Sequence, residues 1–339
     1  MPARRPAGPE EETAVRPPVR LRRLRRTPAL REWVAETRVE PGRLIYPVFV
    51  RADPGPSEPV PSLPGVQRYA VRDLPSLARE LDAEGVRAVL LFGAGRTRDA
   101  EGRDAWAPDG VVPEAVRAIK RSTPEIVVAT DVCLCAYTSH GHCGVVERGE
   151  VRNDPTCERL GRVAVAHARA GADVVAPSAM MDGQVARIRA ALDRAGHPET
   201  AILAYSSKHA SAFYGPFREA EGSAPEFGDR RGYQMDYRNA REALREMDRD
   251  AEEGADLLMV KPALTSLDLL VRARDRFLLP LVAYHVSGEY AALKAAVVAG
   301  IVEERPAVEE TLTAIRRAGA DLIITYFARD FARWTSGGR

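Results

Sequence analysis

The sequence contains very little lysine. Of its 49 lysine and arginine residues only four are lysines, namely Lys120, Lys208, Lys261 and Lys294. Arginine thus serves wherever a plain positive charge is sufficient, but it cannot lose its proton and act as an amine nucleophile, whereas a desolvated lysine can. The positions that keep lysine are therefore candidates for chemistry.

Other absences exclude whole classes of protein. No apolar run approaches the ~20 residues that span a bilayer, and the N-terminus lacks the apolar core of a secretion signal. A net charge of +1 gives no global support for nucleic acid or an anionic membrane as a partner. Four cysteines in 339 residues argue against a disulfide scaffold. We expect a cytoplasmic protein in a reducing compartment, with no membrane and no nucleic-acid partner.

The N-terminal 38 residues differ from the rest of the chain. Residues 1–19 are rich in Pro, Arg, Ala and Glu and are expected to be disordered. The following LRRLRRTPALREWVAETRV has helical character, and its Leu and Trp side chains are spaced to cover a partner's surface. We interpret residues 1–38 as an N-terminal arm that forms an oligomer, and residues 39–339 as one catalytic domain.

That second region alternates between apolar runs and helical patterns. Strands are predicted at residues 44–50, 87–93, 125–132, 173–178, 201–206, 256–261, 281–287 and 321–327. The similar segments AGADVV, EGADLL and AGADLI recur where a predicted helix ends and the next strand begins, and their glycine is suited to the helix C-cap. Eight β/α units over ~290 residues predict an α/β fold, a (β/α)8 TIM barrel. The alternative is an open doubly wound sheet, but that fold usually has fewer strands, and no GxGxxG follows the first strand.

Barrel active sites lie at the C-terminal ends of the strands. The residues predicted there are polar and reactive, namely Asp131, Cys133, Ser178, Lys208, Lys261, Ser287 and Tyr326. Two ammonium groups in one barrel mouth repel each other, so at least one pKa should fall, and a neutral amine can form a Schiff base with a ketone. The alternative for each is a buried lysine paired with a carboxylate. Lys120 and Lys294 lie in amphipathic helical patterns and are expected to be solvated.

The loop after the third strand carries a candidate metal site. Cys133, Cys135 and Cys143 form a C-x-C-x7-C pattern with His140 and His142 between them. Three thiolates suit Zn²⁺ and leave a fourth position for substrate or water, although either histidine could close the site. Such a zinc is a weak Lewis acid unless nearby cations compensate its charge. The alternative is a set of inert reduced thiols. Cys157 is separate and is expected to be structural.

A long irregular segment, HASAFYGPFREAEGSAPEFGDRRGYQ, follows Lys208 and is interpreted as a lid. It carries Arg218, Arg230 and Arg231, and a guanidinium fork binds a carboxylate through two hydrogen bonds. These arginines indicate a carboxylic acid as substrate; the alternative for any one of them is an ordinary surface residue. The hydroxyls of Ser287 and Tyr326 could hold a second carboxylate.

Together, DVCLCAYTSHGHCG, APSAMMDG, SKHASAFYGPFREA, FGDRRGYQM, MVKP, YHVSGEY and GADLIITYF resemble the porphobilinogen synthase (5-aminolevulinate dehydratase) family. The likeness runs from about Arg22 to Trp334. It implies a (β/α)8 barrel with an arm, assembled from dimers into a homo-octamer. The implied reaction joins two molecules of 5-aminolevulinate into porphobilinogen with the loss of two waters, on the path to heme.

The resemblance also implies residue roles. Lys261 would be the Schiff-base lysine, Lys208 the second active-site lysine, and Cys133, Cys135 and Cys143 the ligands of a catalytic Zn²⁺. Asp131 and Ser178 would line the site. One substrate carboxylate would be bound by Arg218, Arg230 and Gln234, and the other by Ser287 and Tyr326. Tyr284 would pack against the substrate ring, Tyr214 and Phe217 would contact the substrate, and Glu246 would bind an allosteric Mg²⁺.

The chain departs from the family pattern at three positions. Ala179 and Gln184 stand where the family usually has Asp and Arg, and Ser266 where it tends to have Tyr. Two alternatives therefore stay open: a diverged member that performs Schiff-base chemistry on another amino ketone, and a non-catalytic metal-binding protein.

Overall fold

The computed structural model describes residues 19–53 and 55–336. The chain divides into two compact units, Met1–Arg38 and Val39–Arg339. The disorder expected for residues 1–19 falls, except for Val19, outside the described residues.

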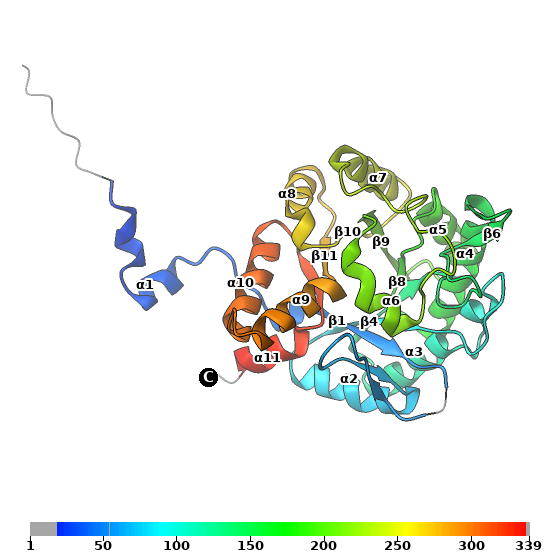
Figure 1. Ribbon diagram of the computed structural model, residues 1–339, viewed down its shortest axis with the longest axis horizontal. Coiled ribbons are helices and arrows are strands. Elements are labelled where there is room, and N and C mark those ends of the chain that lie inside the picture. The colour runs from blue at the N-terminus through cyan, green and yellow to red at the C-terminus, as the bar shows by residue number, and fades with distance from the viewer. Residues whose placement is uncertain (1–18, 54, 337–339) are drawn as a thin grey trace, which may run out of the picture. The chain divides into compact units, whose positions relative to one another are not determined.

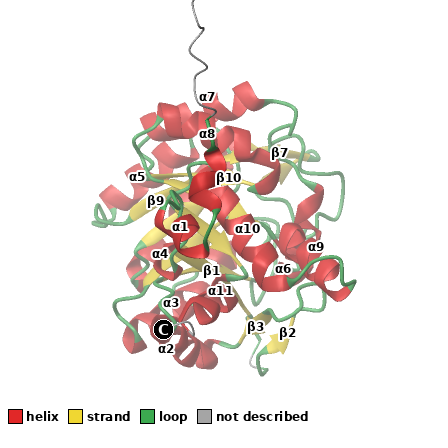
Figure 2. Ribbon diagram, turned by 90° about the vertical axis from the view of Figure 1, so that its left-hand side faces the viewer, coloured by secondary structure: helices red, strands yellow, loops and turns green. Residues whose placement is uncertain are grey.

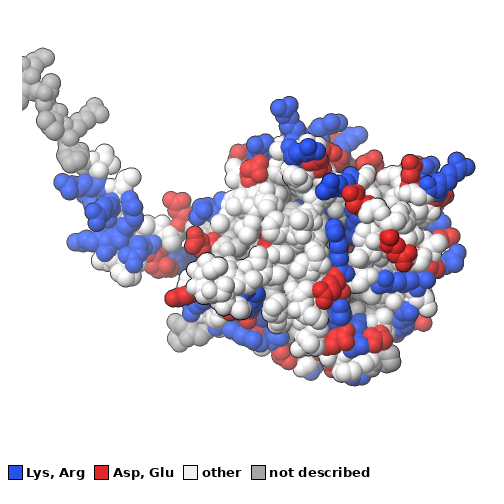
Figure 3. Space-filling view, viewed as in Figure 1, with Lys and Arg blue, Asp and Glu red and all other residues white. Residues whose placement is uncertain are grey.

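The described part of the first unit has two short helices, η1 (Leu21–Arg25) and α1 (Pro28–Trp33). Thr27 caps α1, because its hydroxyl accepts the Leu30 N–H at 3.2 Å, and Pro28 stands at the first helical position. Neither helix buries a residue, and Leu21 and Trp33 are 72% and 79% exposed. Arginines cluster on this segment (Figure 3). Its apolar side chains have no core of their own.

The second unit is a closed parallel barrel (Figures 1 and 2). Its strands follow the order β1, β4, β5, β8, β9, β10, β11, β12, and β12 pairs with β1 through Leu44↔Ile323 and Ile45↔Ile324. Their bounds are Leu44–Val50, Ala88–Gly93, Val127–Val132, Val174–Pro177, Ala201–Lys208, Leu257–Lys261, Leu281–His285 and Leu322–Thr325. All eight predicted strands are confirmed, with ends within two residues of the prediction. Closure excludes the open doubly wound alternative.

Helices surround the barrel, as Figure 2 shows. They are α2 (Leu74–Ala83), α3 (Val111–Ser122), α4 (Asn153–Ala170), α5 (Gln184–Arg194), α7 (Ala240–Glu252), α8 (Leu267–Arg276), α9 (Ser287–Val298), α10 (Glu304–Arg317) and α11 (Ala328–Ser336). The recurring phrase has the expected geometry, since Gly171 and Gly319 follow α4 and α10 with φ of 102° and 122°, a conformation that favours glycine.

Two β-hairpins and one additional helix lie in segments that follow barrel strands. The hairpins are β2 (Glu58–Pro59) with β3 (Gln67–Tyr69), and β6 (Val145–Glu147) with β7 (Glu150–Arg152). Helix α6 (Gly215–Glu221) lies in the predicted lid, after η5 (Ala212–Tyr214). The lid closes on itself at its base, where the Ala210 N–H donates to Met235 O at 2.8 Å. None of the described helices has the length and apolarity needed to cross a membrane.

Candidate active site

Lys208 and Lys261 end neighbouring strands β9 and β10 in paired register. Both are buried, with 6% and 4% of their surface exposed. Lys208 Nζ donates to Ser178 O at 2.5 Å. Lys261 Nζ lies instead among aromatic rings, 4.1 Å from the centre of Tyr284 and 4.9–5.2 Å from those of Tyr205, Phe217 and Tyr214. The two amines therefore share one barrel mouth but differ in their surroundings.

These surroundings favour a neutral Lys261. Burial, followed by the charge of Lys208, lowers the pKa of Lys261 to about 7, because both disfavour the ammonium form. Burial raises the pKa of Asp131 to about 6, against the opposing influence of Lys208. An amine and a carboxyl group that both change protonation near neutral pH are suited to imine formation and proton transfer.

The other two lysines serve packing and charge pairing. Lys120 on α3 contacts Asp173 at 2.6 Å and donates to Ile126 O at 2.9 Å. Lys294 on α9 pairs with Glu304 and lies 5.1 Å from the Phe327 ring centre. Their side chains are only 21% and 19% exposed, so the prediction of freely solvated positions is wrong. A carboxylate holds each one at the surface of the barrel.

The three cysteines of the β5 loop converge. The sulfur atoms of Cys133, Cys135 and Cys143 all lie within 4.8 Å of one another, and all three residues are buried. Hydrogen bonds from Cys133 and Cys135, then the positive charges of Arg230 and Lys208, hold the pKa of the Cys143 thiol well below its usual range. A buried trio of thiols with a thiolate-favouring environment fits a soft or borderline divalent metal such as zinc.

Cys157 and the two histidines are not part of this trio. Cys157 on α4 is buried against Asp182 O at 3.5 Å, and burial raises the pKa of its thiol to about 11. His142 contacts the Tyr233 hydroxyl at 3.1 Å and Phe227 O at 3.0 Å. His140 accepts the His142 N–H at 3.1 Å and contacts Ala100 O. The histidines support the loop, and the geometry does not favour either as a fourth ligand.

The lid carries a buried polar cluster suited to an anion. Arg218 Nε, Arg230 Nε and both amide atoms of Gln234 are buried with no hydrogen-bond partner among the described residues. Arg230 is fixed by donating to Gly141 O at 2.9 Å. Burial, then the positive charge of Arg230, lowers the pKa of Arg218. Buried donors of this kind are normally satisfied, so a carboxylate suits this position.

Aromatic and hydroxyl groups connect the lid to the barrel. The Tyr284 and Tyr326 hydroxyls lie 3.4 Å apart. Ser287 accepts the Phe217 N–H at 3.1 Å and donates to Phe213 O at 3.3 Å, so its hydroxyl holds the lid against the start of α9. The Phe217 ring packs edge-on against Phe92 at 4.9 Å. The lid thereby covers Lys261.

The chain is similar in sequence to proteins of known identity. A sequence profile of delta-aminolevulinic acid dehydratases matches residues 18–334. The chain is 54% identical over 316 residues to the dehydratase of Methanothermobacter thermautotrophicus, which covers 93% of this chain and 96% of that one. It is 50% identical over 313 residues to the Escherichia coli protein of that name, covering 92% and 96%.

The chain belongs to the delta-aminolevulinic acid dehydratase family. A solved dehydratase (porphobilinogen synthase) from Toxoplasma gondii, in complex with the reaction product porphobilinogen, matches with a TM-score of 0.91 and 47% identity over 94% of this chain and 91% of that one. The predicted family resemblance and barrel fold are confirmed. Identity near one half along the whole barrel is that of an ordinary member, so the diverged-member alternative is not supported.

The three departures lie inside the dehydratase fold. Ala179, Gln184 and Ser266 are 0%, 3% and 4% exposed. Gln184 begins α5, and its side-chain oxygen accepts the Met181 N–H at 3.3 Å. This residue therefore has a local role in ordering the loop between β8 and α5, next to Ser178.

Glu246 lies apart from the thiol loop. It is half-buried on α7, and it lines a surface cavity with Asp182, Glu242 and Asp250. Burial, followed by the charges of Asp182 and Glu242, raises its pKa. A carboxyl group whose pKa is raised by neighbouring carboxylates favours a cation.

Two groups at the site are not predicted from the sequence. The Tyr205 hydroxyl is buried without a partner among the described residues, and its ring lies under both lysines. Glu221, the last residue of α6, is 6% exposed and accepts from Cys135 Sγ at 3.7 Å. Tyr205 lies in β9 at a shift in the pairing register with β10, so alternation counted back from Lys208 does not mark it as inward-facing, and the sequence FREAE contains no signal that its second acid is buried.

Proposed function

We propose that this dehydratase condenses two molecules of 5-aminolevulinate into porphobilinogen. The observation that carries the proposal is the paired, buried Lys208 and Lys261 beside three convergent thiols. One amine with a pKa of about 7 suits attack on a ketone, and the metal-binding thiols suit a second substrate. The family relationship indicates 5-aminolevulinate as the substrate and porphobilinogen as the product, and these residues have the chemical groups that the reaction needs.

Lys261 acts as the nucleophile in the proposed reaction. Its neutral amine adds to the C4 ketone of one 5-aminolevulinate, and the nitrogen loses two protons while the oxygen leaves as water, which gives an imine. Lys208 Nζ, on the neighbouring strand, and the Asp131 carboxyl can accept and return these protons. The carbon beside the ketone of the second substrate then loses a proton and bonds to the imine carbon, and the bond from that carbon to Lys261 breaks, so Lys261 leaves as a free amine. The amine of the first substrate adds to the ketone of the second, whose oxygen leaves as the second water, and loss of a further proton from the ring gives the pyrrole.

Cys133, Cys135 and Cys143 would hold the metal, and zinc is the ion that their chemistry favours. When bound, it would supply a Lewis acid that orients and polarises the second substrate. Arg230 and Lys208 act on the charge of this centre, because both stabilise the Cys143 thiolate. They thereby offset the negative charge of three thiolates.

The side chains that bind the substrate carboxylates, together with the lid, determine which molecules react. Arg218, Arg230 and Gln234 bind the carboxylate of one substrate, and Ser287 with Tyr326 that of the other, beside Tyr284, Tyr214 and Phe217. Ser287 is already bonded to the lid backbone, so substrate binding and lid position are linked. A closed lid excludes water, which protects imines from hydrolysis.

Assembly and a second metal belong to the same proposal. The exposed Leu21 and Trp33 of the arm support a homo-octamer of dimers in which each arm covers another subunit. Glu246 and its acidic neighbours support an allosteric Mg²⁺ site. Four free cysteines fit a reducing cytoplasm.

The test is to supply 5-aminolevulinate to zinc-loaded, reduced protein and to measure the pyrrole with an aldehyde colour reagent. We expect pyrrole formation that a chelator stops and added zinc restores. Absence of pyrrole from protein shown to contain zinc would contradict the proposal and favour the non-catalytic alternative.

A further inference from the structure

The β2–β3 hairpin meets the lid at the edge of the barrel. Strand β3 extends the barrel sheet, because Arg68 pairs with Phe49 of β1 in parallel register, and Glu58 of β2 stands directly opposite Arg68. The Phe49 ring lies 5.5 Å from the ring of Phe217 on the lid helix α6. This edge of the sheet therefore brings both an aromatic ring and an arginine close to one short helix.

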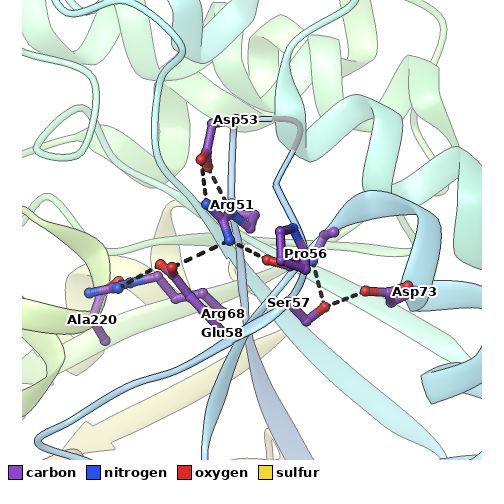
Figure 4. A network of polar contacts seen from close by, with 9 residues as sticks. Arg51, Asp53, Pro56, Ser57, Glu58, Arg68, Asp73 and Ala220 are labelled. Carbon is purple, nitrogen blue, oxygen red and sulfur yellow. Dashed lines mark hydrogen bonds and ion pairs between the residues drawn. The ribbon is translucent and has the colours of Figure 1, made fainter.

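The Arg68 guanidinium holds the C-terminal end of that helix (Figure 4). Its Nε donates to Ala220 O at 2.6 Å and its Nη2 donates to Glu219 O at 2.7 Å, while Nη1 donates to Glu58 at 3.0 Å. The last carbonyls of a helix have no partner within it, and a cation at this end also meets the negative end of the helix dipole. Three nitrogen atoms of one side chain thus join the hairpin to the lid.

Arg68 is itself held in place by the barrel. Its side chain is 26% exposed, and Glu58, which accepts from it, also contacts Arg51 just after β1 at 3.3 Å. Arg51 in turn donates to Asp53 at 2.8 Å. An isolated exposed ion pair contributes little to stability, whereas a planar guanidinium fixed by a network is pre-organised for the carbonyls that it meets.

The position of α6 matters because the helix carries groups of the site. The Phe217 ring lies 5.0 Å from Lys261 Nζ, and Arg218 has a buried Nε without a partner among the described residues. A helix of seven residues is not stable by itself, so contacts at its two ends must hold it. Ser287 accepts the Phe217 N–H at the first turn. The last turn borders a cavity of ≈ 810 Å³ that Arg68 also lines, so polar bonds attach it on that side.

We propose that Arg68 is a positioning residue for the condensation. By docking the C-terminal end of α6 on the barrel, it keeps Phe217 and Arg218 over the substrate, and Glu58 acts through it by orienting the guanidinium. The inference rests on the proposed function and deepens it. Loss of Arg68 shifts the lid toward an undocked state, so the apparent substrate affinity falls with the fraction of molecules that remain docked.

The test measures the lid and the reaction separately in the full-length protein. Hydrogen exchange of residues 215–222, followed by mass spectrometry, reports the docking of α6 and needs no turnover. Steady-state kinetics with 5-aminolevulinate give kcat and KM. Arg68→Gln removes the guanidinium, Arg68→Lys keeps its charge, and Glu58→Gln removes the acceptor that orients it. Arg305→Gln is the matched control, because Arg305 donates to Glu309 at 2.8 Å within α10.

We expect Arg68→Gln to speed exchange in residues 215–222 by about 10- to 100-fold, the range for losing a hydrogen bond to a charged group. KM should rise several-fold with a smaller change in kcat. Arg68→Lys should have an intermediate effect, because an ammonium group lacks the planar fork that meets two carbonyls and a carboxylate. Adding Glu58→Gln to Arg68→Gln should cause no further change, because Glu58 acts through Arg68. Arg305→Gln should match wild type.

Wild-type exchange and KM in Arg68→Gln would overturn the inference. Exchange that accelerates equally in β10 would overturn it too, because Arg68 would then support the whole barrel and not the lid. If wild type forms no pyrrole, the proposed function fails, whereas the exchange of residues 215–222 still decides whether Arg68 docks the lid. Should Arg68→Gln fail to fold, Arg68→Lys and Glu58→Gln decide by the same two measurements.

Discussion

Lys208 and Lys261 stand directly opposite each other on two hydrogen-bonded parallel strands, yet only Lys208 has a backbone acceptor. Lys261 is surrounded by four aromatic rings, the nearest being Tyr284 at 4.1 Å. A ring face stabilises a cation less than water does, so these surroundings favour a free electron pair on Lys261. This asymmetry supports the proposal that Lys261 is the nucleophile.

Imine formation should depend on pH with a midpoint near 7. Below that value Lys261 is an ammonium and cannot attack, and above it the neutral amine accumulates, so the rate rises with pH through about 7. Lys208 lowers this pKa, whereas Asp131, Glu221 and Cys135 raise it. Lys208→Met should therefore move the midpoint to higher pH. Borohydride trapping in single-turnover samples across the pH range measures it, and a midpoint that stays or falls would be inconsistent with coupled lysines.

Lys261→Met should leave the fold intact and reduce pyrrole formation by at least about 10³-fold, because no other described amine lies in the same aromatic setting. Lys120→Met is the matched control. It should keep activity but lower the Tm, since Asp173 and the Ile126 carbonyl lose their donor. Residual turnover near wild type in Lys261→Met would exclude the nucleophile assignment.

Cys143→Ser should abolish tight zinc binding and reduce activity at least about 100-fold, because a hydroxyl does not ionise as this thiol does. Cys157→Ser, outside the trio, should retain one zinc per chain. Elemental analysis after gel filtration gives both values. Equal zinc loss in the two variants would mean that the trio is not the binding site.

Arg218→Gln should raise the KM for 5-aminolevulinate about 10- to 100-fold with a smaller effect on kcat. A charge-assisted hydrogen bond contributes about 1.5–3 kcal/mol, and about 1.4 kcal/mol is tenfold in binding. Arg231→Gln is the control, since its side chain is 77% exposed. Steady-state kinetics on both variants test the assignment, and similar KM values in the two would contradict it.

Much of the fold follows from the sequence because the signals are local. The apolar runs of the eight barrel strands and the glycines that end α4 and α10 identify eight β/α units, and barrel closure follows from their number. The ends of strands are predicted less accurately than their presence, since β9 continues to Lys208, two residues beyond the apolar run. The extension arises from pairing with β10, which a single segment cannot reveal.

The site is predictable where residues end strands, and only in part where they lie in the lid. Lys208, Lys261 and Asp131 follow from strand position alone. Glu221 does not, because it lies in α6, a lid helix whose last carbonyls accept from Arg68 in a distant part of the chain. Likewise, the position of His142 between the cysteines suggests a metal ligand, but its two ring nitrogens contact the Tyr233 hydroxyl and Phe227 O of the lid. Lid contacts join distant segments, and no local pattern encodes them.

The central claim is that Lys261 forms an imine with 5-aminolevulinate, and borohydride reduction followed by peptide mass mapping tests it most directly. The account predicts a stable adduct on the peptide that contains Lys261, formed with wild type and absent from Lys261→Met. An adduct confined to Lys208, or none at all in protein that produces the pyrrole, would contradict it.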